Sequence, residues 1–161
     1  MTDKEYVICI PSYKRSNFCN NKTLATLSKH KIDAKRIFVY VANNEEFKLY
    51  ETVLNPKLFN KIIIGKKGLV PQRQFIMNNW KKGKHIVFFD DDIESIDLTL
   101  SPRFKTHNLD YFIKDAFKEC EKQQSFIWGV YPVFNPFFRK PIQELSSQLN
   151  YIVGAFYGII N

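Results

Sequence analysis

The chain has 161 residues, of which 45% are hydrophobic and 16% aromatic, so it can bury a core and is not a disordered protein. Its formal net charge is +8: residues 1–80 carry 14 Lys and Arg against 6 Asp and Glu, whereas residues 81–161 carry ten of each. A basic half suits nucleic acid or the phosphates of a small ligand, although a solvated surface explains it equally well.

The three cysteines, at positions 9, 19 and 120, are odd in number and lack Cys-x-x-Cys spacing, which excludes a disulfide framework and a zinc site of that type. The first residues are charged and no apolar run reaches the roughly 18 residues of a membrane span. We therefore expect a protein without a membrane span, located in the cytoplasm, or in the host cytoplasm if the protein is viral.

Apolar runs alternate with helical patterns through the first 90 residues. Strands are expected over residues 6–10, 36–41, 61–64 and 86–89. Helices are expected over about 21–30, after a cap at Asn43 or Asn44 and up to Pro56, and from Pro71 as first helical residue to Gly83. This alternation predicts parallel strands with right-handed crossovers, and a strand order of 3-2-1-4 would place the ends of the first and fourth strands side by side.

The second half of the chain is less regular. Residues 93–98 alternate as a short edge strand does, and Asn108 precedes an amphipathic helix. Residues 126–131 and 150–160 are expected to be strands, the latter with Gly154 and Gly158 allowing a close backbone approach. The predicted fold class is a single α/β domain over residues 1–161, with an open, mostly parallel sheet, helices on both faces and a small mixed C-terminal part.

Three carboxylates, Asp90, Asp91 and Asp92, directly follow the fourth apolar run. Adjacent carboxylates repel one another unless a cation or a basic partner compensates them. Two of them, with water and phosphate oxygens, would form a Mg²⁺ or Mn²⁺ site that neutralises a departing diphosphate. A solvated acidic turn is the alternative interpretation of the same residues.

Other phosphate and hydrolase motifs do not occur. The chain lacks the Walker A spacing and has no Gly-x-Gly-x-x-Gly after the first strand. It also lacks the Gly-x-Ser-x-Gly and His-Glu-x-x-His motifs. These absences disfavour P-loop, dinucleotide-binding, serine hydrolase and zincin chemistry.

Four features occur in order: Ile10–Arg15 at the end of the first strand, Gly68–Gln74 opening a helix, the fourth strand, and Phe89–Ile93. This set resembles the GT-A glycosyltransferases, whose Asp-x-Asp motif holds a metal and a nucleotide-sugar. It also resembles viral and phage members, among them the TET/JBP-associated glycosyltransferases linked to hydroxymethylated bases in DNA. The resemblance implies a nucleotide-sugar-binding half at 1–97 and a partial acceptor-side half at 98–161, in a chain that is short for the family and is interpreted as a fragment.

The resemblance also implies roles for the three carboxylates. Asp92 is the expected main metal ligand and catalytic residue, assisted by Asp90, whereas Asp91 is expected to contact the ribose or the sugar. The cofactor would be Mn²⁺ or Mg²⁺ and the donor a nucleotide-sugar, with a UDP-sugar as first choice. The residues expected to bind the nucleotide-sugar, besides Asp90 and Asp91, are Pro11, Ser12, Tyr13, Arg15, Asn43, Gly68 and Arg73.

Two of these expected binding residues, Arg73 and Asn43, differ in how they match the family pattern. Arg73 stands where the family has a helix-opening arginine that approaches the diphosphate or the acidic motif itself. Asn43 stands where many members carry an Asp toward the base, which is a departure from the pattern.

The acceptor side is weakly marked. Many inverting members use a carboxylate base from the C-terminal part of the fold, and Glu144 is the isolated candidate here. The acceptor is open between a glycan and a hydroxylated nucleobase. Two other functions remain: a basic nucleic-acid-binding module without catalysis, and a nucleotidyltransferase, which shares the sheet and the use of paired Asp residues.

Overall fold

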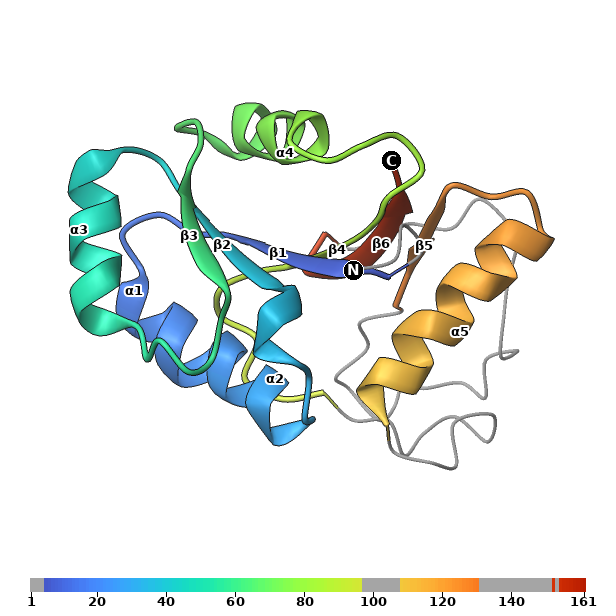
Figure 1. The fold of residues 1–161 in the computed structure, drawn as a ribbon, viewed down its shortest axis with the longest axis horizontal. Helices are drawn as coiled ribbons and strands as arrows, with labels where there is room; N and C mark the ends of the chain where they lie inside the picture. Colours follow the sequence, from blue (N-terminus) through green and yellow to red (C-terminus); the bar gives the residue numbers. More distant parts are fainter. Residues whose placement is uncertain (1–4, 97–107, 131–151, 153) are drawn as a thin grey trace, which may run out of the picture.

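A computed structural model describes residues 5–96, 108–130, 152 and 154–161 of the chain. Six strands form one sheet in the order β3-β2-β1-β4-β6-β5 (Figure 1). The first four strands are mutually parallel, and β6 alone runs antiparallel to its two neighbours, β4 and β5. The expected α/β class with a mostly parallel sheet is therefore confirmed. The strands are β1 (Val7–Pro11), β2 (Ile37–Val41), β3 (Lys61–Ile64), β4 (His85–Phe89), β5 (Ile127–Gly129) and β6 (Phe156–Ile160).

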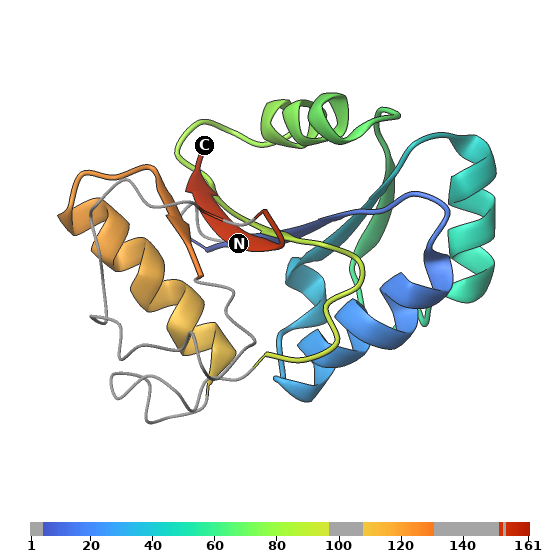
Figure 2. The ribbon, with the colours of Figure 1, turned by 180° about the vertical axis from the view of Figure 1, so that it is seen from behind.

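The central strands are buried on both faces because helices cover both. Helix α4 (Leu69–Asn78) lies alone on one face of the sheet, and the other described helices lie on the opposite face (Figures 1 and 2). Alternate residues of β1 accordingly enter two apolar clusters: Val7 and Cys9 pack toward α4, and Ile8 and Ile10 pack toward the other helices. The helices of that second face are α1 (Ser16–Phe18), α2 (Ala25–Lys29), α3 (Asn44–Val53) and α5 (Leu109–Lys122).

Two predicted helix caps are confirmed. The Asn43 side-chain oxygen accepts a hydrogen bond of 2.9 Å from the Glu46 N–H at the start of α3. The Asn108 side-chain oxygen accepts one of 3.0 Å from the Tyr111 N–H at the start of α5. Each cap satisfies a first-turn N–H that has no partner within its helix.

The first helical segment begins earlier than the range of about 21–30 that the sequence predicts. Helix α1 begins at Ser16, and a π-helical turn, η1 (Cys19–Leu24), joins it to α2 without a break. Ser16 and Cys19, one turn apart, are both buried, so the polar residues around them form a helix rather than a loop. A short 3₁₀ turn, η2 (Ala34–Arg36), then leads into β2.

The ends of α4 also differ from the prediction. Pro71 is the third helical residue and not the first, which is tolerated because first-turn N–H groups have no acceptor within the helix. The helix ends at Asn78, so Gly83 does not end it. Gly83 adopts a positive φ of 83° in the turn before β4.

The edge strand predicted over residues 93–98 is wrong for its described part, 93–96, which is irregular. Helix side chains take the place of a partner strand there: Thr23 Oγ1 accepts from the Ile93 N–H, and the Thr26 hydroxyl donates to the Glu94 carbonyl. The apolar residues of the alternation, Ile93 and Ile96, still pack against the core. The remaining two positions lie outside the described residues.

The second half of the chain completes the same sheet. β6 lies between β4 and β5, with Gly158 opposite both Val87 and Trp128. A Cβ atom at Gly158 would overlap the Trp128 indole, so the close approach expected at this glycine is confirmed. The strands expected over 126–131 and 150–160 are observed as the shorter β5 and β6. Positions 131, 150, 151 and 153 of the expected strands lie outside the described residues. Among the described residues, no helix has the length and apolar character to cross a membrane.

Candidate functional site

The candidate site lies where the connections leave the sheet in opposite directions. β1 has β2 on one side and β4 on the other, so the loops that follow β1 and β4 lie side by side at the carboxyl end of the sheet, where ligands of such folds bind. The loop Ser12–Arg15 follows β1 and the triplet Asp90–Asp92 follows β4. The Ser12 hydroxyl donates a 2.5 Å hydrogen bond to Asp91 Oδ2, which joins the two loops as the sequence predicts.

Asp91 is the buried member of the triplet, with no exposed side-chain surface. Ser12, its hydrogen-bond donor, lies 2.6 Å from the Tyr50 hydroxyl, which also accepts a bond of 3.1 Å from the Arg15 N–H. Because the single Ser12 O–H is donated to Asp91, the Tyr50 O–H donates to Ser12 Oγ. Burial raises the pKa of Tyr50 to about 12, so its hydroxyl stays protonated. The chain Tyr50–Ser12–Asp91 fixes the loop after β1 to the end of β4.

Arg15 bridges two of the carboxylates. Its Nη2 lies 2.7 Å from Asp91 Oδ1, but no N–H points at that oxygen in hydrogen-bonding geometry. Its Nη1 donates a 3.1 Å hydrogen bond to Asp92 Oδ2. Arg15 and Asp92 are about equally exposed, at 48% and 47% of the side chain. The basic loop after β1 therefore supplies a basic partner that compensates the charge of the triplet.

Asp90 is compensated by Arg73 of α4. Arg73 Nη2 lies 3.6 Å from Asp90 Oδ1 and donates a 3.0 Å hydrogen bond to the Gly154 carbonyl. The guanidinium also lies over the Tyr157 ring, at 5.4 Å from its centroid. Arg73 therefore lies against both the triplet and the segment before β6.

The backbone around Asp90 is fixed from two further sides. The Asp90 N–H donates a 2.9 Å hydrogen bond to the Ala155 carbonyl, and its own carbonyl accepts one of 2.7 Å from Thr23 of the π-helical turn. Elements before β2 and before β6 thus position the first Asp of the triplet. π-helical turns often occur at functional sites, and this one carries the threonine that holds Asp90.

Both inner carboxylates have raised pKa values. Burial raises the pKa of Asp90 above its ordinary 3.8; Arg73 opposes this shift, and the charges of Asp92 and Asp91 add to it. Burial likewise raises the pKa of Asp91, against the Ser12 hydrogen bond and the Arg15 charge. The two arginines therefore do not fully compensate the negative charge of the triplet.

This shift predicts how the stability of the metal-free protein depends on pH. A raised pKa means that the folded protein binds the proton more tightly, so the contribution to stability is full below 3.8 and is lost as pH rises through the folded pKa. We expect the wild type to lose free energy of unfolding relative to Asp91→Asn as pH rises above 3.8. Urea denaturation of both proteins at successive pH values checks this, and a difference that is constant with pH would contradict it.

The donor set fits a hard divalent cation with two protein ligands. Asp90 and Asp92 keep 35% and 47% of their side-chain surface exposed, and their charges repel each other, whereas Asp91 is enclosed. Mg²⁺ and Mn²⁺ are commonly held by one or two carboxylates, with water and phosphate oxygens completing the shell. Among the described residues, no group of three or more His, Cys, Asp or Glu side chains is placed to hold a metal ion.

The rest of the loop after β1 faces the loop after β3. Pro11 is the last residue of β1, and Tyr13 is exposed at 38%. The Nζ atoms of Lys14 and Lys67 lie 5.4 and 5.6 Å from the centroid of the Tyr13 ring. An aromatic ring, with two ammonium groups beside it, therefore stands at the rim of the site.

Two predicted binding residues, Asn43 and Gly68, form the starts of helices α3 and α4. Asn43 is exposed, but its side-chain oxygen is engaged as the cap of α3. Gly68 precedes α4 with a φ of 102°, a conformation that favours glycine, and so sets the start of the helix that carries Arg73. Glu144, the proposed base, lies outside the described residues.

Several residues of the site were not predicted. The buried carboxylate of Glu46 accepts a 2.8 Å hydrogen bond from the Lys14 N–H, which fixes a loop residue with positive φ. Gln72, also buried, accepts from the Lys66 N–H and donates to the Val41 carbonyl. A Glu three residues after an Asn cap was an available sequence signal for Glu46. Thr23, Tyr50 and Gly154 had no such signal, since their roles depend on contacts distant in sequence.

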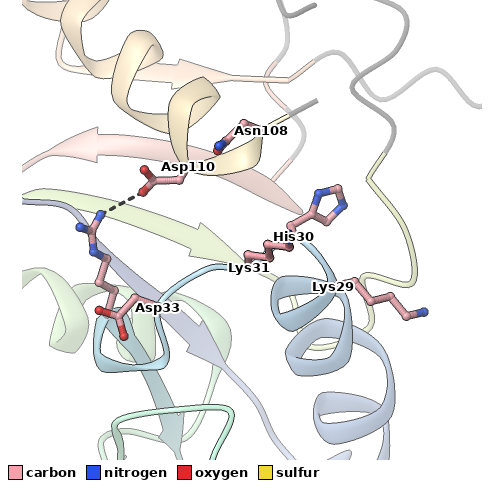
Figure 3. Close-up of a pocket in the computed structure, with 7 residues that line it drawn as sticks. Lys29, His30, Lys31, Asp33, Asn108 and Asp110 are labelled. Carbon is pink, nitrogen blue, oxygen red and sulfur yellow. Dashed lines mark hydrogen bonds and ion pairs between the residues drawn. The ribbon is translucent and has the colours of Figure 1, made fainter. Parts of the chain in front are cut away.

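A separate cavity of about 450 Å³ lies at the opposite, amino-terminal edge of the strands (Figure 3). Arg36 pairs there with Asp110 at 3.0 Å and with Glu5 at 3.4 Å, and Asp110 also accepts from Tyr6 and Lys114. This network fastens α5 to the start of the sheet. The described residues that line the cavity are Lys29, His30, Lys31, Asp33, Arg36, Asn108 and Asp110, and none of them is a predicted site residue.

Comparison with known proteins does not extend these observations. No protein-family model matches the chain, and no curated protein matches its sequence.

Proposed function

We propose that this protein is a metal-dependent glycosyltransferase of the GT-A type, using a nucleotide-sugar donor, with a UDP-sugar as first choice. The observation that carries the proposal is the acidic triplet at the switch point between β1 and β4. There, two partly exposed carboxylates flank a buried one, and an arginine stands on each side. Acidic ligands and basic groups in one site suit a divalent cation together with a diphosphate.

The bound Mn²⁺ or Mg²⁺ would supply Lewis-acid neutralisation of the leaving nucleoside diphosphate. Asp90 and Asp92 would hold the cation, since their carboxylates are partly exposed. Asp91 would act indirectly, because its enclosed carboxylate holds Ser12 and Arg15 in place. This assigns Asp91 a positioning role instead of the sugar contact that the resemblance implies.

The remaining predicted residues would bind the nucleotide or support its site. Tyr13 offers an exposed ring on which a base can stack. Pro11 precedes this loop, whereas Ser12 and Asn43 would support the site indirectly, because Ser12 is bonded to Asp91 and the Asn43 oxygen caps α3. Arg73 lies beside Asp90 and would donate to the diphosphate there, at the helix that begins after Gly68. The acceptor, a glycan or a hydroxylated nucleobase, and the role of Glu144 as base belong to the same proposal, as does a cytoplasmic location.

Metal removal tests the donor half of this proposal directly. We expect isothermal titration calorimetry to show binding of UDP or a UDP-sugar in the presence of Mn²⁺ and loss of that binding in EDTA. The affinity should fall at least about tenfold, because the phosphates then face the partly uncompensated carboxylates. A panel with UDP-, GDP- and CDP-sugars identifies the base.

Other outcomes point to the other functions. Nucleotide binding that is absent, or equally strong in EDTA, would contradict the glycosyltransferase. Metal-dependent binding of a nucleoside triphosphate with release of pyrophosphate would favour a nucleotidyltransferase. Steeply salt-dependent binding of DNA without any nucleotide binding would favour a basic nucleic-acid-binding module.

A further inference from the structure

Arg15 contacts two carboxylates that differ sharply in their surroundings. Asp91 is fully buried and also accepts the Ser12 hydrogen bond, so it cannot turn away. Asp92 is half-exposed, and its only partner among the described residues is Arg15. The Arg15 guanidinium therefore pairs with one buried, fixed carboxylate, Asp91, and with one exposed carboxylate, Asp92.

The contact between Arg15 and the buried carboxylate is an ion pair without hydrogen-bonding geometry. Arg15 Nη2 lies 2.7 Å from Asp91 Oδ1, yet no N–H is directed at that oxygen, so charge and not a linear hydrogen bond holds the pair. The backbone of Arg15 is fixed by its N–H bond to the Tyr50 hydroxyl. Asp91 and the Tyr50 hydroxyl thus anchor Arg15 without using its Nη1, which pairs with the exposed Asp92.

The contact with Asp92 lies where a cation would bind. Arg15 Nη1 donates to Asp92 Oδ2 at 3.1 Å, and Asp92 is the residue expected to be the main metal ligand. A divalent ion on the same carboxylate would be repelled by a guanidinium at hydrogen-bonding distance. The two cations therefore compete for Asp92.

We propose that Arg15 is an exchangeable counter-ion that couples binding of the divalent cation to binding of the nucleotide phosphates; this rests on the proposed function. Without ligands, Arg15 neutralises Asp92. When the cation binds, Arg15 turns about Asp91, and its released Nη1 donates to a phosphate oxygen. Arg15 thus opposes the cation alone and favours the cation and the phosphates together, which is positive coupling between two ligands.

Calorimetry with Mn²⁺ alone, UDP alone and UDP in saturating Mn²⁺ tests this coupling. We expect Arg15→Gln to bind Mn²⁺ alone about tenfold more tightly and UDP in saturating Mn²⁺ about tenfold more weakly, within the usual range of coupling between sites. Lys14→Gln is the matched control, because it removes the neighbouring positive charge of the same loop, which has no carboxylate partner among the described residues. It should change the Mn²⁺ affinity by less than about twofold.

Three results separate failure of the inference from failure of the proposed function. Unchanged or weaker Mn²⁺ binding by Arg15→Gln would show that Arg15 does not compete with the cation. Equal gains in Mn²⁺ affinity in Arg15→Gln and Lys14→Gln would show that the loss of any positive charge has this effect. That result would overturn the proposed exchange at Asp92. If neither the wild type nor any variant binds Mn²⁺ or UDP, the proposed function itself is wrong, and the exchange with it. Should Arg15→Gln not fold, Arg15→Lys keeps the charge but cannot span both carboxylates, and should still weaken the coupling.

Discussion

Replacing Asp92 by Asn is expected to lower the affinity for UDP in the presence of Mn²⁺ at least about 100-fold. Even the mutation of residues that only hydrogen-bond to a metal ligand typically lowers metal affinity 10–100-fold. The fold should be almost unaffected. Asp92 is half-exposed, and Arg15 keeps Asp91 when Asp92 is neutral, so the free energy of unfolding should change by about 0.5 kcal/mol or less. Calorimetry and urea denaturation measure the two quantities.

A matched control separates a metal ligand from general electrostatics. Glu94→Gln removes the same charge two residues further on, from a side chain that is 78% exposed and pairs with Lys22. It should leave the affinity for UDP in Mn²⁺ within about twofold of the wild type. Equal losses in Glu94→Gln and Asp92→Asn, or undiminished binding by Asp92→Asn, would exclude Asp92 as a ligand.

Replacing Gly158 by Ala is expected to destabilise the fold by about 3 kcal/mol, at the upper end of the usual cost of overpacking. The added Cβ would overlap the Trp128 indole, which packs edge-on against Phe112, Phe117 and Phe156. The rigid indole cannot move without displacing these rings. Urea denaturation measures the loss.

A double substitution tests whether the indole causes that loss. Trp128→Leu frees the space above Gly158, so the cost of Gly158→Ala in the Trp128→Leu background should fall by more than about 1 kcal/mol, the usual size of coupling between residues in contact. Equal costs in the two backgrounds would place the strain elsewhere in β6. A Gly158→Ala protein that is as stable as the wild type would show that the sheet accommodates the methyl group.

The strands and the place of the site follow from local sequence. Four apolar runs separated by helical patterns predict parallel strands, and the order 3-2-1-4 expected of a doubly wound sheet places the ends of the first and fourth strands side by side. The contact between Ser12 and Asp91 confirms that placement. Asn43 and Asn108 cap the helices that follow them, because capping depends only on the next three residues.

The inner arrangement of the triplet does not follow from local sequence. Nothing in three identical residues shows that Asp91 turns inward. That depends on Ser12 and Arg15, which are far away in the chain. The irregular path of residues 93–96 was missed for the same reason, since it is held by the hydroxyls of Thr23 and Thr26 and not by its own alternation.

The contact of Arg73 with the Gly154 carbonyl, 81 residues further along the chain, has a consequence for folding kinetics. Together with the bond from Asp90 to Ala155, it makes the site depend on contacts between residues far apart in the chain, which carry a large loop-closure entropy and form slowly. The first four strands can pair before residues 154–160 dock, but Arg73 and Asp90 reach their final positions only afterwards. During refolding, competence to bind a nucleotide should therefore lag behind the recovery of helical circular dichroism.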